Sequence, residues 1–194
     1  MHHEHIKELI DESIHVHTTA HELIPSIEMA ADILVHSLQH GGKILICGNG
    51  GSAAEVQHFS SELIGKFEKE RRALAGIALT TDGSTITAVG NDAGFEFVFL
   101  RQVEALGNEG DVLVCLTTSD YEDIDKHSMN LKNAIVKARE KGMKTILIGS
   151  IKSKKIGELV DTAIKVNNEK TARIQEVHLL IVHILTKIIE EHFL

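Results

Sequence analysis

The stretch KILICGNGGSAAEVQHFSSEL, residues 43–63, joins an aliphatic run, a glycine-rich turn and a helix-like segment. The run is apolar at successive positions, as buried strands of parallel sheets are. The glycines let the backbone turn sharply and expose its amides, and Ser52 can cap the following helix, whose N-terminus favours an anion. The stretch therefore predicts strand, turn and helix, with a turn that either cradles a phosphate or is an ordinary connection.

Further aliphatic runs alternate with helix-like segments along the rest of the chain. This alternation predicts an α/β fold, a doubly wound and mainly five-stranded parallel sheet flanked by helices. The later runs are GIALT (76–80), DVLVCL (111–116), KTILIG (144–149) and TAIKV (162–166), and the segments between the runs lie at about 53–66, 94–106, 129–141 and 153–159.

Both ends of the chain have helical periodicity. Apolar residues recur at helical spacing over 4–40, which predicts two helices, with Pro25 near the start of the second. The last segment, 173–194, is apolar on more than one face, so we expect its surplus to meet another subunit. The length fits one domain over 1–194, with N-terminal helices over 1–40 and an α/β core with the C-terminal helix over 41–194.

Charge and composition narrow the class of function. The 20 Lys and Arg against 28 Asp and Glu give a formal net charge of -8, which argues against a nucleic-acid or anionic-lipid surface. No stretch approaches the ~18 apolar residues of a membrane span. Cys47 and Cys115 each close an apolar run without metal-type spacing, so we expect reduced thiols and a cytoplasmic protein.

Polar side chains follow three of the predicted strands, where ligands bind in open α/β sheets. Thr117, Thr118 and Ser119 offer hydroxyls suited to phosphate oxygens, although hydroxyls are also common in ordinary turns. Asn91 and Asp92 read as a turn after the second strand, which either holds a sugar hydroxyl or is plain turn chemistry.

Acid and base candidates lie on two predicted helices. His58 and Glu62, four positions apart, share a helix face, as surface pairs commonly do. His183 lies within LLIVHILTKII, with Gln175 on the same helix, and a histidine in such a setting is often a satisfied core residue. From the residues alone, both structural and catalytic interpretations stay open.

Five blocks together resemble the phosphoheptose isomerases of the sugar isomerase (SIS) domain family: CGNGGSAAEVQHFSSEL, AVGNDAGFEFVF, GDVLVCLTTS, KAREKGMKTILI and TARIQEVHLLIVHIL. The resemblance covers nearly the whole chain, in order. It implies a SIS-type, flavodoxin-like three-layer sandwich and a homotetramer. It also implies an isomerase that converts sedoheptulose 7-phosphate to D-glycero-D-manno-heptose 7-phosphate through an enediol, in heptose biosynthesis for lipopolysaccharide or capsule.

The resemblance also implies roles for individual residues. Glu62 is the expected base that moves a proton between the first two sugar carbons, and His183 the expected acid at the sugar oxygens. Zn²⁺ is implied at His58, Glu62, Gln175 and His183, although a neutral amide is a weak zinc ligand. The implied substrate-binding residues are Asn49, Gly50, Gly51, Ser52, Glu62, Asn91, Asp92, Thr117, Thr118, Ser119, Ser128 and Gln175.

The chain departs from the family pattern after Ser119. TTSDYEDIDKHSMNLKNAI carries an apparent insertion of six residues, after which Ser128 matches the last phosphate-binding serine. The insertion brings four acidic residues near the expected phosphate, which repel a dianion unless they point to solvent or are offset by Lys126 and His127. The acidic residues are Asp120, Glu122, Asp123 and Asp125.

Two alternatives to this function stay open. The insertion allows an isomerase of a different phosphosugar. The other alternative is a non-catalytic SIS protein that binds a phosphosugar or a partner such as a replication initiator. Retention of both Glu62 and His183 favours the enzyme.

Overall fold

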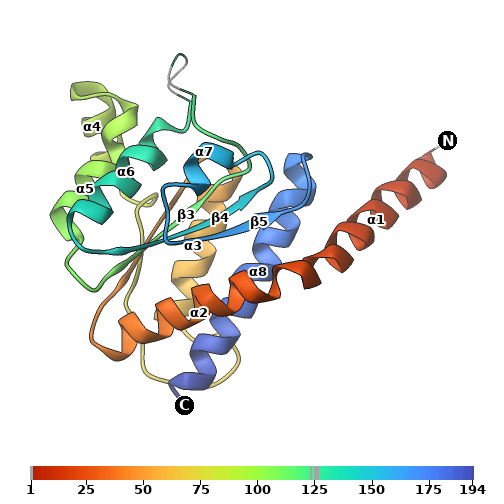
Figure 1. The fold of residues 1–194 in the computed structure, drawn as a ribbon, viewed down its shortest axis with the longest axis horizontal. Coiled ribbons are helices and arrows are strands. Elements are labelled where there is room, and N and C mark those ends of the chain that lie inside the picture. The colour runs from red at the N-terminus through yellow and green to blue at the C-terminus, as the bar shows by residue number, and fades with distance from the viewer. Residues whose placement is uncertain (1, 123, 125–126) are drawn as a thin grey trace.

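The computed structural model describes residues 2–122, 124 and 127–194 and shows a parallel sheet between two layers of helices (Figure 1). In chain order the elements are α1 His2–Thr19, η1 Ala20–Leu23, α2 Ile24–Gln39, β1 Ile44–Gly48, α3 Gly51–Ile64, β2 Gly76–Ala78, α4 Gly83–Asp92, η2 Phe95–Phe97, α5 Val98–Leu106, β3 Val112–Leu116, α6 Met129–Glu140, β4 Lys144–Ser150, α7 Lys154–Gly157, β5 Thr162–Val166 and α8 Thr171–His192.

The sheet has five parallel strands in the order β2-β1-β3-β4-β5. From β1 the chain crosses to β2 on one side and then returns to β3 on the other, so the strand order reverses between β1 and β3. At such a reversal the connecting loops diverge and leave a crevice beyond the carboxyl ends of the strands. The predicted α/β class and five-stranded sheet are confirmed.

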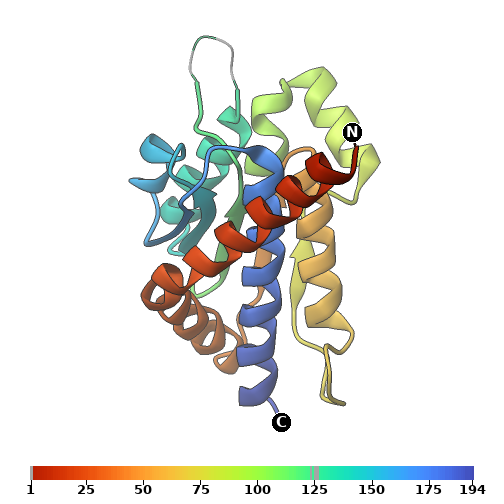
Figure 2. The ribbon, with the colours of Figure 1, turned by 90° about the vertical axis from the view of Figure 1, so that its right-hand side faces the viewer.

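Alternate strand residues face opposite helical layers, and both faces of the sheet are buried. Ile44 and Ile46 of β1 belong to a core shared with α2, α3 and α8. Leu45 and Cys47 belong to a second core, shared with α5 and α6. Figure 2 shows α8 alongside α3 in the first layer. Burial on both faces explains why these strands read as continuous aliphatic runs.

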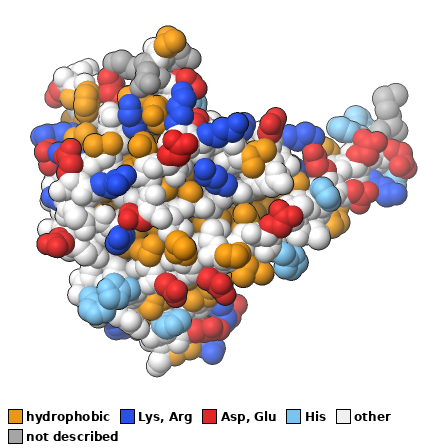
Figure 3. All heavy atoms as spheres, in the orientation of Figure 1, with side chains coloured by type: hydrophobic (Ala, Val, Ile, Leu, Met, Phe, Trp, Pro, Cys, Tyr) orange, Lys and Arg blue, Asp and Glu red, His pale blue; other side chains and the backbone are white. Residues whose placement is uncertain are grey.

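Helix α1 projects from the body as an arm (Figures 1 and 3). Its only buried residue among those described is Val16, close to the body, whereas Ile10 and Ile14 are 53% and 59% exposed. Pro25 lies in the first turn of α2, as expected from its missing N–H and fixed φ. Among the helices of the described ranges, none is both long and apolar enough to cross a membrane.

Helix α4 is the main departure from the expected elements. Residues 83–92 were read as part of a connection, but they form a helix whose N-cap Asp82 accepts a hydrogen bond from the backbone N–H of Thr85 (3.1 Å). The glycines and β-branched residues of α4 have low helix propensity, so the sequence does not predict a helix there. The predicted turn at Asn91 and Asp92 is therefore wrong: both are the last residues of α4.

Other differences concern the ends of elements. The second strand ends at Ala78 rather than at residue 80, and α7 is one turn, Lys154–Gly157, within the helix expected over 153–159. The last helix begins at Thr171, two residues earlier than expected, which brings Gln175 into its second turn.

Candidate active site

The turn after β1 forms the start of the site. Gly50 is the N-cap of α3 with a φ of +55°, a conformation that favours glycine. A side chain at Gly51 would collide with the amide of Gln175, so glycine permits the close approach of α8 to the N-terminus of α3. The expected cap at Ser52 is wrong: no side chain caps α3, and Ser52 is buried within its first turn.

A cavity of about 420 Å³ opens beyond the carboxyl ends of β1 and β3. Nine predicted substrate-binding residues line it: Asn49, Gly50, Gly51, Ser52, Thr117, Thr118, Ser119, Ser128 and Gln175. Five further residues complete its lining: Phe95, Leu116, His127, Asn130 and Thr171. Hydroxyls, amides and the N-terminus of α3 face this space, and such groups suit a phosphate.

The cavity wall is braced across the sheet reversal. The side-chain amide of Asn49 donates to Oδ1 of Asn130 (3.0 Å), and the amide of Asn130 donates to Oδ1 of Asn49 (2.8 Å). This reciprocal pair ties the turn after β1 to the start of α6. Asn130 was missed by sequence reasoning, and its position directly after Met129 at a predicted helix start is the only signal that could have pointed to it.

The end of β4 and the turn after it hydrogen-bond the hydroxyl-rich segment after β3. Ser150 Oγ donates to the carbonyl of Thr118 (3.2 Å), and Ser153 Oγ donates to the carbonyl of Ser119 (3.0 Å). Both serines are fully buried. The backbone of 117–119 is therefore anchored at its carbonyls.

A second group of polar side chains lies further along α3 and α8. His58 Nε2 is 2.9 Å from His183 Nε2 and 3.6 Å from Glu62 Oε1. The side chains of His58 and Glu62 are 38% and 19% exposed, so both reach solvent. The structure thus brings His58 into contact with both predicted catalytic residues, a carboxylate and an imidazole suited to proton transfer.

The loop after α3 covers His183. The ring of Phe67 stacks on the His183 ring with centroids 5.6 Å apart and an interplanar angle of 28°. Glu190 of α8 holds this loop, because its buried carboxylate accepts hydrogen bonds from the backbone N–H groups of Phe67, Glu68 and Lys69 at 3.1–3.2 Å.

Two opposing effects act on the pKa of Glu190. Burial raises this pKa, but the backbone N–H donors and the nearby Arg71 guanidinium outweigh burial, so the pKa is lowered from its ordinary value. Arg71 in turn donates to the carbonyl of Leu63 (2.9 Å) and to that of Glu62 (2.6 Å) at the end of α3. Glu190 and Arg71 therefore fix both the loop and the end of the helix that carries Glu62.

The predicted metal ligands are not gathered in one place. Gln175 lines the cavity at the N-terminus of α8, whereas His58, Glu62 and His183 lie together further along the helices. Among the described residues, no three His, Cys, Asp or Glu side chains form a group that could hold a metal ion. In this arrangement the four residues do not fit a tetrahedral zinc site.

Asn91 and Asp92 lie apart from the other predicted substrate-binding residues. Asp92 lines a separate hollow, which also includes Arg101, Glu104 and Lys137. Asn91 donates from its side-chain amide to Oδ1 of Asp92 (2.8 Å). Within one chain, these two residues do not line the cavity.

The described acidic residues of the insertion are engaged outside the cavity. Asp120 accepts hydrogen bonds from the backbone N–H groups of Lys155 (2.7 Å) and Ile156 (2.9 Å), and Glu122 pairs with the Lys155 ammonium (3.4 Å). The expected repulsion of a phosphate by these two carboxylates is thereby reduced. Asp123, Asp125 and Lys126 lie outside the described residues.

A buried pair between α3 and α8 was also missed by sequence reasoning. His178 is fully buried and bonds through Nε2 to the carbonyl of Gly149 (3.0 Å), so Nε2 carries the proton. Its Nδ1 faces Glu55 Oε2 at 3.7 Å, and neither atom has a hydrogen-bond partner among the described residues. In the sequence, His178 lies in an apolar helical stripe, and no pattern there indicates a partner for it.

Comparisons with known proteins show the family of this chain. The model of the SIS domain family matches residues 10–150. The chain is 52% identical over 167 residues to a phosphoheptose isomerase of Campylobacter jejuni, covering 86% of this chain and 87% of that protein. It is 45% identical to a phosphoheptose isomerase of a Nitratiruptor species, covering 98% and 99%.

A solved structure is similar throughout. The structure of a phosphoheptose isomerase from Francisella tularensis superposes with a TM-score of 0.91 at 40% identity, covering 98% of this chain and 99% of that one. The likeness therefore includes the N-terminal helices and α8 as well as the sheet.

Proposed function

Since the chain belongs to the SIS domain family, and within it to the phosphoheptose isomerases, we propose that it interconverts sedoheptulose 7-phosphate and D-glycero-D-manno-heptose 7-phosphate. It is accordingly an enzyme, an aldose–ketose isomerase. Its product would serve heptose biosynthesis for a bacterial surface polysaccharide such as lipopolysaccharide or capsule. The observation that carries the proposal is the contact of His58 with both Glu62 and His183, beside a cavity suited to phosphate.

The chemistry requires a base at carbon and a proton donor at oxygen. In the proposed reaction Glu62 removes a proton from C1, the C–H electron pair forms the C1–C2 double bond, and the C2 oxygen takes a proton from His183. The resulting enediol then accepts the proton from Glu62 at C2 while the O1 proton returns to His183. The aldehyde forms at C1, and both side chains regain their starting states.

The spacing between the cavity and the proposed catalytic residues suits a long substrate. His183 lies eight positions after Gln175 on α8, roughly 12 Å along the axis at about 1.5 Å per residue. An open-chain heptose phosphate is of comparable length, so its phosphate can occupy the cavity while C1 and C2 approach the catalytic pair. The phosphate ligands are the hydroxyls of Thr117, Thr118, Ser119 and Ser128, with the N-terminus of α3.

The test is turnover of sedoheptulose 7-phosphate by wild type and by Glu62→Gln. Glutamine keeps the size of glutamate but cannot take a proton from carbon, so we expect a loss of about 10²–10⁴-fold in kcat. Substrate-induced thermal stabilisation should survive, because the phosphate-binding residues are separate. Retained turnover in Glu62→Gln would show that Glu62 is not the base.

The same assay separates the two alternatives. Wild type that ignores sedoheptulose 7-phosphate but isomerises another phosphosugar would change the substrate and keep the mechanism. Wild type that binds phosphosugars without turnover would be a binding protein, in which Glu62 and His183 serve no proton transfer.

Zinc at His58, Glu62, Gln175 and His183 stays a proposal that rests on the resemblance. A bound Zn²⁺ would polarise the sugar oxygens, but no step above depends on it. Metal content measured before and after chelation, with turnover of each sample, decides whether these residues hold an ion.

The proposal extends to assembly and location. By resemblance we expect a homotetramer. In such an assembly Asn91 and Asp92 of one chain would line the cavity of a second chain, since they do not line the cavity of their own. We place the enzyme in the cytoplasm, where the buried free thiols of Cys47 and Cys115 stay reduced.

A further inference from the structure

The cavity lining holds one titratable side chain among the residues that the structure describes, and it is His127. The lining contains no described Lys, Arg, Asp or Glu, so the hydroxyls and amides provide no full charge to face a phosphate dianion. His127 comes from the insertion between Ser119 and Ser128, the two ends of the hydroxyl-rich wall. This segment departs from the family pattern, so a role for His127 would distinguish this chain from its relatives.

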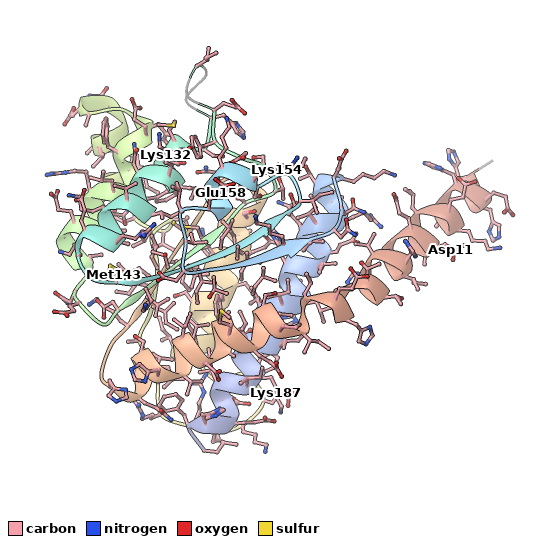
Figure 4. The ribbon with its side chains drawn as sticks, viewed as in Figure 1. Asp11, Lys132, Met143, Lys154, Glu158 and Lys187 are labelled. Atoms are coloured by element: carbon pink, nitrogen blue, oxygen red, sulfur yellow. The ribbon has the colours of Figure 1, made fainter. Side chains whose placement is uncertain are left out.

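The base of the insertion is fixed to the body on the side away from the cavity. Asp120 holds the backbone N–H groups at the start of α7, and the Tyr121 ring has the ammonium of Lys132 at 4.7 Å and that of Lys155 at 5.4 Å. Figure 4, which labels Lys132 on α6 and Lys154 on α7, shows the chain leaving the body above these two helices. The described acidic groups thus face lysines and backbone amides.

The last described residue of the insertion, His127, lies beside the cavity. The backbone N–H of Glu122 donates to the carbonyl of His127 (3.0 Å), which brings residue 127 back toward the end of β3. There His127 Nε2 lies 2.9 Å from the Ser119 hydroxyl. The imidazole is exposed, so the hydroxyl can rotate and the ring nitrogen can take a new partner.

We propose that His127 is a phosphate-binding residue contributed by the insertion, donating from Nε2 to a phosphate oxygen beside Ser119. Among the described lining residues, it has the only side chain that can carry a positive charge. The insertion then strengthens the recognition of a phosphorylated substrate end despite its acidic composition. This inference rests on the proposed function for the identity of the sugar, but not for the binding of phosphate.

The test compares His127→Ala with Glu122→Gln, a matched control in the same insertion whose side chain faces Lys155 instead of the cavity. For His127→Ala we expect about a tenfold rise in KM for sedoheptulose 7-phosphate, as for loss of one charge-assisted hydrogen bond, with kcat within about twofold of wild type. Glu122→Gln should keep the wild-type KM. His127→Lys should recover most of the lost affinity, because it restores a cationic donor.

A parallel measurement needs no turnover. Inorganic phosphate should raise the Tm of wild type and of Glu122→Gln, and should raise that of His127→Ala markedly less. An unchanged KM and an unchanged phosphate shift in His127→Ala would overturn the inference. Equal losses in His127→Ala and Glu122→Gln would overturn it as well, since they would assign the effect to the insertion as a whole and not to the imidazole. Absence of sedoheptulose 7-phosphate turnover in wild type, with the phosphate shifts as expected, would instead contradict the proposed function.

Discussion

At the scale of single residues, Ser128 combines backbone strain with a place in the cavity wall. It is the only non-glycine residue with a positive φ in the described ranges, at 52°, and it precedes α6 without capping it by its side chain. An L-residue in this conformation costs on the order of 1 kcal/mol, and such strain persists where the site requires it. The hydroxyl that α6 leaves unused lines the cavity.

This conflict gives a prediction for Ser128→Gly. Glycine adopts a positive φ freely, so we expect the free energy of unfolding to rise by about 0.5–1 kcal/mol in urea denaturation. Phosphosugar affinity should fall, because the hydroxyl is lost. Ser128→Ala is the control, since it loses the hydroxyl and keeps the strain; a gain in affinity for either variant would contradict the assignment.

Ser128 and its neighbours also show what sequence could predict at this scale. The resemblance named nine residues that the fold brings to one cavity, although they come from four separate segments. It did not indicate Asn130, His178 or Glu55, because an asparagine at a helix start and a histidine in an apolar helix have ordinary structural explanations. Their roles depend on partners far away in sequence.

At the scale of elements, the end of α3, the loop after it and α8 form one connected unit. Glu190 on α8 accepts three backbone N–H groups of the loop, and the loop places Phe67 on His183. Because the folded-state pKa of Glu190 is lowered, its stabilising contribution is present above the unfolded-state value near 4.5. That contribution is lost as the pH falls through the lower, folded-state pKa.

We therefore expect Glu190→Gln to alter the pH dependence of stability. The variant should lose about 1–2 kcal/mol at neutral pH, since charged acceptors bind N–H groups more strongly than amides do. Its free energy of unfolding should fall less steeply than that of wild type when the solution is acidified below about pH 4.5. Urea denaturation at a series of pH values measures both effects, and parallel curves for the two proteins would rule out this role for Glu190.

Among the elements, α4 shows where prediction from sequence failed. The aliphatic strands can be predicted from sequence because burial on both faces requires apolar residues at every position. Helix α4 has no buried residue, so no apolar stripe marks it, and it packs against η2 and α5. Because α4 extends to Asp92, the two predicted sugar ligands, Asn91 and Asp92, lie in a helix and not in the expected turn.

At the scale of the whole molecule, apolar surface remains on the outer parts of α1 and beside α8. Ile6, Leu9, Ile10 and Ile14 of α1 are each more than 40% exposed. A groove further along is lined by residues of η1, α2 and α8, including Leu180, Ile184 and Ile188. Figure 3 shows hydrophobic side chains where the arm meets the body. The chain's own α2 and α3 cover most of the apolar surface of α8, so α1 carries the larger excess.

We expect light scattering to find a homo-oligomer at micromolar concentration, because exposed apolar surface of this kind favours association. Substituting aspartate at Ile10 and Ile14 should shift the protein to smaller species while circular dichroism stays unchanged, since neither side chain belongs to the core. A wild-type monomer at that concentration would contradict the prediction, as would an oligomer indifferent to the substitutions.

The sequence by itself determined the α/β class, the five strands, both N-terminal helices and the glycine turn, because each depends on local periodicity, burial of whole strands or backbone freedom. Through the resemblance it also indicated nine of the cavity residues and proposed Glu62 and His183 as the catalytic pair. Only the tertiary structure decided that His183 contacts His58 on another helix, that Gln175 lies apart from His58, Glu62 and His183, and that Asp120 faces α7. The first two outcomes depend on the parallel packing of α3 with α8, and the third depends on the pairing of β3 with β4, which brings the residues after β3 beside α7. Contacts between segments distant in sequence are set by how whole elements pack, and no local pattern encodes that packing.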